Sequence, residues 1–463
     1  MATASKISKA DLQGIIESLS TPSGQVDPAF VKQFLGRMPV SELKPEQISD
    51  YAAMVDGFYD FIKHRKAGQP KIHVFNPDEQ VHGWKSNHSV IEMVNDDMPF
   101  LVDSVVLALS KLNIAVHLIL HPVMHIKRDQ GGHFMAMAEA SEPGELTESM
   151  IHLQVDRQTS PEVLARIQRR ILRALKDVRL AVDDWQAMRH KALEIADELA
   201  DSESGLEADE VEEARDFFQW LADDHFMFLG YREYEIVDSK EDQQRTLSAV
   251  DGSGLGLMQQ THRKSPDRPL GELGGEARGN NTQIYPIIIT KTNGRSTVHR
   301  DGYMDYISIL RFDDSGRVIG EKRIIGLLTS GAYIRRCQDT PLVRRKVEQV
   351  LKLSGLRLGS HAGKALLHIL ETLPRDELFQ ASSKDLLDLA IGILDLQERV
   401  QTRLFIRRER FGRFYSCMVF IPRDRFNTEN REKVQQILKR ALKGEKLDFA
   451  VQVGESKLAR MHV

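Results

Sequence analysis

Residues 89–101 read SVIEMVNDDMPFL, and this stretch decides the fold of the first part of the chain. Its apolar and β-branched start, 89–94, is typical of a strand. Between residues 101 and 112, leucine and valine side chains recur every three to four positions, as they do on the buried face of a helix. The stretch therefore predicts a strand, a tight turn at 95–99 and a helix.

Further elements follow in an order that defines a fold. Residues 114–126 predict a second strand and 150–155 a third, and SPE at 160–162 opens an amphipathic helix. We expect a last strand near 178–182. The order βαββαβ is the ferredoxin-like plan of an α+β fold, which hosts many unrelated functions, so the turn has to indicate the chemistry.

The turn resembles the first turn of an ACT domain, the amino-acid-binding module of metabolic enzymes. In that family the turn reads acidic residue, variable residue, Pro, Gly, Leu, and residues 97–101 here read DMPFL. The resemblance implies an amino-acid effector at a helix start, where free N–H groups suit a carboxylate. The candidate binding residues are Asn95 and Asp96 for the ammonium group, Phe100, Leu101 and Val102 as N–H donors, and Asp97 as a competing helix cap.

Phe100 stands where the ACT pattern has a glycine that lets a ligand approach the backbone. The alternative is therefore an ACT-like module with a purely structural role.

Composition restricts the class of protein. A chain of 463 residues predicts about three domains, since domains run roughly 100 to 200 residues. The 63 Lys and Arg against 67 Asp and Glu give a net charge of −4, which predicts neither a nucleic-acid partner nor an anionic membrane partner. No apolar run approaches the roughly 18 residues of a membrane helix, and no secretion signal opens the chain, so we expect a cytoplasmic protein.

The two cysteines, Cys337 and Cys417, lie far apart in the sequence and neither belongs to a CxxC pair. This excludes a disulfide framework and a thiolate zinc site, and we expect both to be ordinary buried residues.

Changes of pattern along the chain predict six regions. They are a helical leader (1–80), a first ACT-like domain (86–185), a helical linker (186–206), a PAS-like antiparallel sheet domain (207–340), a helical connector (341–400) and a second ACT-like domain (401–463). The leader has a candidate helix at 10–19. In the sheet domain we expect strands at 226–231, 283–289, 303–312 and 317–328, a hairpin turn at 313–316 and an exposed loop at 261–281.

The connector should break at Pro374, because proline ends or kinks a helix. In the second ACT-like domain we expect strands at 402–407, 413–421 and 448–453, with a helix at 428–442. Residues 457–463 read as another strand in which the sequence stops, so we expect a truncated chain.

Four blocks in one order carry a more specific resemblance. They are VHRDGYMDY at 298–306 with GLLTSGAY at 326–333, SHAGKALL at 360–367, LPRDELFQ at 373–380, and RLFIRR at 403–408 with PRDR at 422–425. Over roughly residues 87–431 the chain resembles the N-terminal regulatory region of bacterial large-type NAD-dependent glutamate dehydrogenases. The resemblance implies an intact enzyme that converts L-glutamate, NAD and water to 2-oxoglutarate, ammonia and NADH.

The catalytic part of such an enzyme is not recognisable in this sequence. A GxGxxG turn between strand and helix would bind the dinucleotide, and GSGLGL at 252–257 has the wrong spacing and no preceding Rossmann strand. We read it as a loop of the sheet domain. We therefore expect no catalytic, cofactor-binding or metal-binding residue here, with NAD bound only by the intact enzyme.

Three histidines, His117, His121 and His125, recur every four residues, which on a helix could place two imidazoles on one metal. Pro122 and the β-branched neighbours favour a strand, where side chains four apart lie roughly 13 Å apart, too far to share a metal. Gly363-Lys364 resembles the end of a phosphate loop but lacks the following Ser or Thr. Neither motif predicts a ligand.

An RNA-recognition domain shares the βαββαβ plan and is a rival interpretation of the C-terminal region. RFGRF at 410–414 matches that family's aromatic motif at two positions but lacks both of its small residues, so we expect no nucleic-acid partner. Arg403, Arg407, Arg408 and Arg413 then either meet acidic groups or face water.

The expected partners follow from the resemblance. They are a second copy of the chain, through exposed ACT sheet edges, an amino-acid effector, and the C-terminal catalytic domain of the same chain. The segment alone should do no chemistry. The alternative function is a free-standing ACT-type amino-acid sensor or scaffold protein without enzymatic activity.

Overall fold

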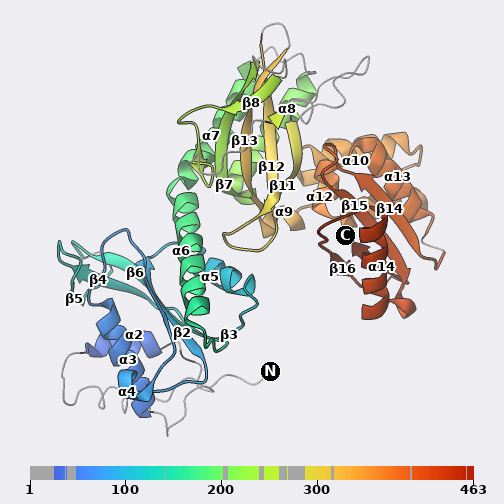
Figure 1. Cartoon of the computed structure of the whole chain (residues 1–463). Helices are drawn as coiled ribbons and strands as arrows, with labels where there is room; N and C mark the ends of the chain where they lie inside the picture. The colour runs from blue at the N-terminus through green and yellow to red at the C-terminus, as the bar shows by residue number, and fades with distance from the viewer. Residues whose placement is uncertain are drawn as a thin grey trace. The chain divides into compact units, whose positions relative to one another are not determined.

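The computed structural model describes residues 26–36, 38, 48–140, 142–201, 207–238, 245–259, 268–269, 287–313, 317–396, 399–454 and 456–463. The chain forms two compact units (Figure 1). Unit 1 comprises Met1–Asp183 and Arg295–Gly302, and unit 2 comprises Asp184–Gly294 and Tyr303–Val463. The predicted helix at 10–19 and the break at 202–205 lie outside the described residues, and so does the predicted loop at 261–281 apart from residues 268–269, which form a short strand.

Unit 1 is built on an antiparallel sheet with the order β1-β2-β6-β4-β5, in which β3 also pairs with β6. Its strands are β1 (Lys71–Phe75), β2 (Ser89–Asp96), β3 (Val116–Leu120), β4 (Val123–Arg128), β5 (Phe134–Met137) and β6 (Leu146–Val155). Its helices are α2 (Pro28–Leu35), α3 (Ile48–Ile62), α4 (Glu79–His82), α5 (Leu101–Ser110) and α6 (Pro161–Asp183).

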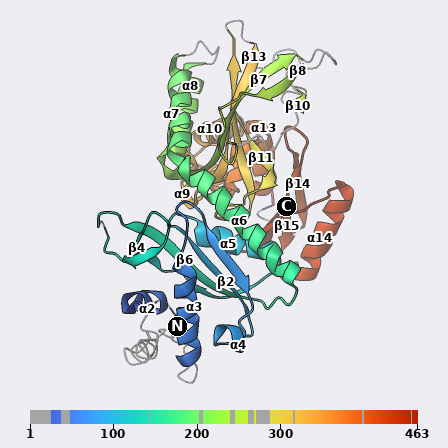
Figure 2. The same ribbon diagram turned by 60° about the vertical axis from the view of Figure 1, so that its left-hand side comes forward.

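Helices cover both faces of this sheet. Figures 1 and 2 show α2 and α3 on one face and α5 and α6 on the other. Phe30, Phe34 and Phe58 from α2 and α3 pack in one buried cluster with sheet residues such as Val90 and Met150. Because both faces are covered, the first seven residues of β2 are buried, which explains why its sequence is apolar rather than alternating.

Two of the predicted strands in unit 1 are wrong. Residues 178–182 are helical and belong to α6, where Val178 continues the buried stripe of Ile167 and Ile171. The edge position next to β2 is taken by β1, which precedes it in the sequence, so the expected βαββαβ order is not reproduced. The predicted strand 114–126 is two strands, β3 and β4, separated at Pro122, which has no N–H to donate.

Unit 2 begins with a second antiparallel sheet with the order β10-β8-β7-β13-β12-β11, in which β9 also pairs with β7. Its strands are β7 (Phe226–Asp238), β8 (Arg245–Ala249), β9 (Leu255–Gly256), β10 (Arg268–Pro269), β11 (Ile287–Arg295), β12 (Tyr303–Phe312) and β13 (Val318–Leu328). The prediction of an antiparallel sheet is confirmed, while its PAS-like character stays a prediction.

Two helices accompany this sheet. Helix α7 (Trp185–Asp201) lies within the segment predicted as a linker and packs against α8 (Ala208–Trp220) and β7. A kinked turn, η3 (Leu221–His225), in which Asp223 and Asp224 have non-helical backbone angles, joins α8 to β7. Part of the predicted strand 283–289 and most of the turn 313–316 lie outside the described residues.

Helices and a small sheet form the rest of unit 2. The helices are α9 (Ser330–Ile334), α10 (Val343–Leu353), α11 (His361–Thr372), α12 (Arg375–Gln380) and α13 (Ser383–Leu394). The break at Pro374 is confirmed, because α11 ends just before it and Pro374 is the N-cap of α12. A four-stranded sheet of order β14-β15-β17-β16 follows, with β14 (Arg403–Arg408), β15 (Tyr415–Pro422), α14 (Thr428–Ala441), β16 (Ala450–Gln452) and β17 (Leu458–His462).

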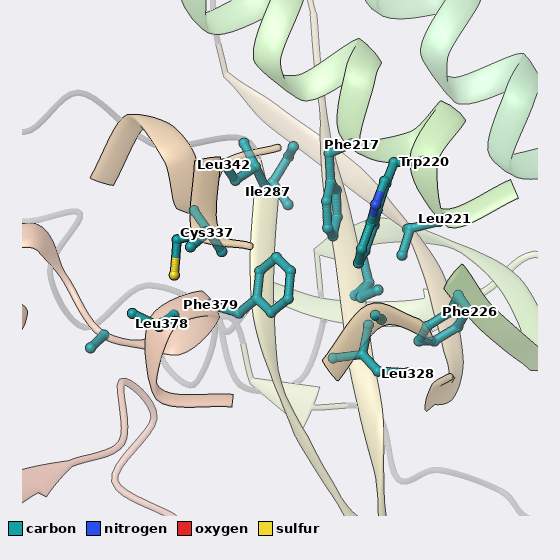
Figure 3. Close-up of a cluster of buried hydrophobic side chains, with 14 of the residues drawn as sticks. Phe217, Trp220, Leu221, Phe226, Ile287, Leu328, Cys337, Leu342, Leu378 and Phe379 are labelled. Atoms are coloured by element: carbon teal, nitrogen blue, oxygen red, sulfur yellow. The ribbon is translucent and has the colours of Figure 1, made fainter. Parts of the chain in front are cut away.

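One apolar cluster unites these parts of unit 2 (Figure 3). The rings of Phe217 and Trp220 on α8 lie 5.7 and 6.1 Å, between centroids, from that of Phe379 on α12. The helices after the large sheet therefore share its core rather than forming a loose connector. No helix in the described part of the chain is long and apolar enough to cross a membrane.

Candidate functional site

The predicted effector turn joins β2 to α5, and the residue that ends it, the N-cap of α5, has an unusual backbone conformation. Phe100 has φ +70° and ψ 5°, the left-handed region that L side chains avoid and glycine adopts freely. The conformation gives a physical reason for the glycine of the ACT pattern at this position. Leu101 is buried and Val102 half-buried, and no side chain caps the start of α5.

Asp96 is already paired with two arginines. Its carboxylate oxygens lie 2.5 Å from a guanidinium nitrogen of Arg65 and 2.6 Å from one of Arg179. Burial acts to raise the pKa of Asp96, but the hydrogen bonds from Arg65 and Arg179 outweigh it and hold the pKa below its ordinary value. Asp96 is therefore not a free acceptor for a ligand's ammonium group in this conformation.

Arg65 also belongs to a buried ionic cluster. Arg65, which is 2% exposed, donates from Nε to Glu148 over 2.9 Å, and Arg128 donates to the other oxygen of Glu148 over 2.7 Å. Glu148 is fully buried, so its negative charge has to be matched within the protein. The cluster connects three strands and the chain after α3.

The neighbours of Asp96 in the turn also have partners. Asn95 is buried and donates from Nδ2 to the main-chain oxygen of Asp96 over 2.9 Å. Asp97 does not cap α5, as we expected, because its Oδ1 accepts a hydrogen bond from Ser149 Oγ over 2.5 Å. Amino-acid binding at this turn stays a prediction.

A distant segment of the chain lies on the start of α5. The main-chain N–H of His299 donates to Ser104 Oγ over 3.0 Å, and His299 Nδ1 lies 2.8 Å from Asp103 Oδ2. The imidazole also packs against the ring of Phe100, with centroids 5.1 Å apart. Sequence reasoning missed this contact, because nothing local in the two segments shows that they meet.

Two further hydrogen bonds hold the segment 295–302 in unit 1. Lys111 Nζ donates to the main-chain oxygen of Ser296 over 2.6 Å, and Thr297 Oγ1 donates to Asp177 over 2.7 Å. Val298 in the same segment is fully buried. The first residues of the block VHRDGYMDY thus have a structural role on the ACT-like sheet unit.

The three spaced histidines each have a separate partner. His117 Nε2 lies 2.8 Å from Asp156, His121 Nε2 lies 3.0 Å from Ser149 Oγ, and His125 Nδ1 bonds Glu145. The described residues contain no group of three acidic, His or Cys side chains that could hold a metal ion. The prediction that they belong to strands is confirmed for His117 and His125, on β3 and β4.

Two of the four C-terminal arginines meet acidic groups. Arg407 donates to both carboxylate oxygens of Glu377, each over 2.9 Å, and Arg413 donates to Glu409 over the same distance. Glu377 also accepts from Ser416 Oγ. Burial acts to raise the pKa of Glu377, but the hydrogen bonds from His462, Arg407 and Ser416 lower it to about 2.

Two other predictions are settled by the structure. Cys337 and Cys417 are both free and buried, as expected, and burial raises the pKa of each thiol to about 11. In the described stretch up to residue 259, the glycine-rich residues 252–257 do not lead into a helix, and Leu255–Gly256 form β9 beside β7. The loop interpretation is confirmed for residues 252–254, whereas Leu255–Gly256 form a short strand.

Comparison with protein-family models matches three consecutive parts of the chain. Residues 30–171 match the ACT1 domain of glutamate dehydrogenase, 340–399 match its helical motif 1 and 403–463 match its ACT2 domain. The three models follow one another in the order of the predicted regions.

Curated relatives agree with these matches. The NAD-specific glutamate dehydrogenase of Halomonas elongata is 39% identical over 95% of this chain, and that of Pseudomonas aeruginosa is 32% identical over all of it. The NAD-specific glutamate dehydrogenase of Mycobacterium tuberculosis is 28% identical over 92% of the chain. The chain spans 27%, 29% and 24% of the length of these three relatives. The chain therefore belongs to the family of large NAD-dependent glutamate dehydrogenases, of which it represents the N-terminal region with its two ACT domains.

Proposed function

We propose that this chain is the regulatory and assembly segment of an enzyme that converts L-glutamate, NAD and water to 2-oxoglutarate, ammonia and NADH. The observation that carries the proposal is the match to NAD-specific glutamate dehydrogenases over 95% of the chain but only 27% of the relative. The reaction then belongs to the part of the relatives that this chain does not span.

The segment itself does no chemistry in this proposal. A nucleotide site of the Rossmann type needs glycines between a strand and a helix, with the pyrophosphate at the helix start. The glycine-rich stretch of this chain instead contains β9, which pairs antiparallel with β7. NAD is the cofactor of the intact enzyme, in the cytoplasm, and the two unpaired cysteines are consistent with a reducing compartment.

The proposal is tested by assaying two proteins in parallel. The 463-residue chain and the product of the complete gene are each incubated with L-glutamate and NAD, and NADH formation is followed by absorbance. We expect NADH from the complete product and none from the chain alone. Micromolar, saturable NAD binding by the chain alone in calorimetry would contradict the proposal that NAD binds outside this segment. A complete gene product without activity would favour a sensor or scaffold protein.

We also propose that the protein self-associates through a sheet edge. Strand β16 lies at the end of the last sheet, and its residues Ala450, Val451 and Gln452 are all exposed. An uncovered strand edge pairs readily with another chain. Light scattering should show a species larger than the monomer, and Val451→Lys should shift it toward the monomer. A strictly monomeric wild-type protein would contradict this part of the proposal.

A further inference from the structure

An open pocket of about 540 Å³ lies in unit 2, between the η3 turn and helix α9. η3 ends α8, and α9 follows β13, so both walls stand at one end of the large sheet (Figure 1). The pocket is lined by Asp223, Asp224, His225, Gly331, Ile334 and Arg335. No local motif in the sequence marks this combination of residues.

The acidic wall is fixed by its backbone. Asp224 has φ +57°, and the turn is held by hydrogen bonds from Arg189 Nε to the oxygen of Ala222 (2.7 Å) and from Thr329 Oγ1 to the oxygen of Asp224 (2.9 Å). Thr329 is also the N-cap of α9, so its side chain connects the η3 turn to the start of α9. Within the described residues, the side chains of Asp223 and Asp224 have no hydrogen-bond or ion-pair partner.

His225 adds a buried acceptor to the same wall. Its side chain is 7% exposed, its ring stacks on Trp220 with centroids 4.4 Å apart, and Nδ1 lies 3.0 Å from the main-chain oxygen of Trp220. A carbonyl oxygen can only accept, so Nδ1 carries the proton and Nε2 of the neutral ring keeps its lone pair. Nε2 has no hydrogen-bond partner among the described residues.

The opposite wall is basic and apolar. Arg335 is exposed, and its guanidinium group has no acidic partner in the described part of the chain. Its main-chain N–H donates to Gly331, and its main-chain oxygen accepts from Arg375, so the backbone that carries the guanidinium is fixed. The neighbouring Ile334 is 83% exposed, which is unusual for so large an apolar side chain.

We propose that this pocket binds a free α-amino acid. Asp223, Asp224 and His225 Nε2 accept from the α-ammonium group, Arg335 binds the α-carboxylate with its planar fork of donors, and Ile334 contacts the ligand's side chain. A zwitterion is the small ligand that satisfies both walls at once, since neither an anion nor a cation alone pairs with both. The role of the bound amino acid as an effector rests on the proposed regulatory function, whereas the binding itself does not.

Calorimetry on the 463-residue chain tests the proposal directly. The twenty L-amino acids are screened at millimolar concentration, and the tightest binder is compared with its N-acetyl derivative and its α-carboxamide. We expect saturable binding by at least one amino acid. Each derivative lacks one of the two charges and should bind at least tenfold more weakly. No binding by any of the twenty, or equal binding by both derivatives, would overturn the proposal.

Matched variants locate the site. Asp224→Asn keeps a residue that tolerates a left-handed backbone, and Arg335→Gln removes the positive charge but keeps a polar side chain. Each should raise the Kd at least tenfold. Asp339→Asn and Arg336→Gln change the same residue types on exposed positions outside the pocket and should leave the Kd unchanged.

A third control distinguishes the pocket from the turn at α5. Asp103→Asn alters the start of α5 and should not affect binding to the pocket. If Asp103→Asn abolishes binding while Asp224→Asn and Arg335→Gln retain it, the amino acid binds at the turn and the proposal is wrong. A complete gene product that does not reduce NAD would refute the proposed function and leave the result on binding intact.

Discussion

The ring of Phe100 packs against the imidazole of His299, and both residues have a left-handed backbone, with φ values of +70° and +65°. A left-handed conformation costs an L residue roughly 1 to 2 kcal/mol, and both Phe100 and His299 carry this cost in the folded protein. Strained residues persist only where the surrounding structure holds them. Here the hydrogen bonds of His299 to Ser104 and Asp103 provide that support.

Phe100→Gly and Phe100→Ala should separate the two energies at this position. Both variants lose the ring contact with His299, but only glycine relieves the backbone. We expect Phe100→Gly to be more stable than Phe100→Ala by about 1 kcal/mol, measured by urea unfolding. Equal stabilities, or a more stable alanine variant, would show that the turn changes conformation when the ring is removed.

Asp96→Ala should destabilise unit 1 whether or not a ligand binds there. It removes the partner of Arg65 and Arg179, and a lost charge-assisted hydrogen bond costs about 1.5 to 3 kcal/mol. Because Asp96 is 31% exposed, we expect a value near the lower limit. The pKa of Asp96 is depressed in the folded state, so this stability is present above the unfolded value of 3.8 and is lost as the pH falls below it.

Urea unfolding at a series of pH values checks this prediction. Asp60→Ala is the control, because Asp60 is 75% exposed in its ion pair with Lys63, and such pairs contribute about 0 to 1 kcal/mol. If the two variants lose the same stability at neutral pH, Asp96 has no special role in the cluster.

Local patterns predicted most elements because their cause is local. Strand β2, helix α5 and the end of α11 before Pro374 all follow from spacing and residue type. Residues 178–182 were misread because a short apolar run with valines fits a strand and a buried helix equally. The spacing from Ile171 favours the helix, because Val178 lies two helical turns further along the same buried face.

The candidate site was harder to predict because its partners come from far along the chain. Asp96 meets Arg65 and Arg179, and neither arginine is marked by any local motif. His299 reaches the start of α5 from the connection between β11 and β12. Such contacts depend on topology, which sequence spacing alone does not contain.

Lys346→Met should destabilise unit 2 strongly. Lys346 Nζ donates to the main-chain oxygens of Leu378, Phe379 and Ala381, at 3.1, 2.6 and 2.9 Å, and so satisfies carbonyls at the end of α12. A buried acceptor left without a partner costs about 1 to 3 kcal/mol, so we expect a loss of about 2 kcal/mol or more. Urea unfolding with Lys352→Met as the control checks this, because Lys352 is an exposed lysine on the same helix. A loss as small as that of the control would mean that water replaces the ammonium group.

Glu377 makes the stability of unit 2 depend on pH in a defined window. Burial disfavours its charge, yet the donors His462, Arg407 and Ser416 bring its pKa in the folded state to about 2, against 4.5 for the free side chain. A group with a depressed folded pKa stabilises the fold above its unfolded pKa and loses that contribution as the pH falls through the folded value. The difference corresponds to about 3 kcal/mol, lost between pH 4.5 and pH 2.

Glu377→Gln should therefore lower the free energy of unfolding by about 3 kcal/mol at neutral pH. The free energy of unfolding of this variant should also decrease less than that of the wild type between pH 4.5 and pH 2. Arg407, whose side chain is 13% exposed, loses a bidentate carboxylate partner, which adds to the cost. The measurement is urea unfolding followed by circular dichroism from neutral to acidic pH. Glu432→Gln serves as the control, because Glu432 is 55% exposed in its ion pair with Arg431. If the free energy of unfolding of Glu377→Gln falls between pH 4.5 and pH 2 as steeply as that of the wild type, other carboxylates control the acid unfolding of unit 2.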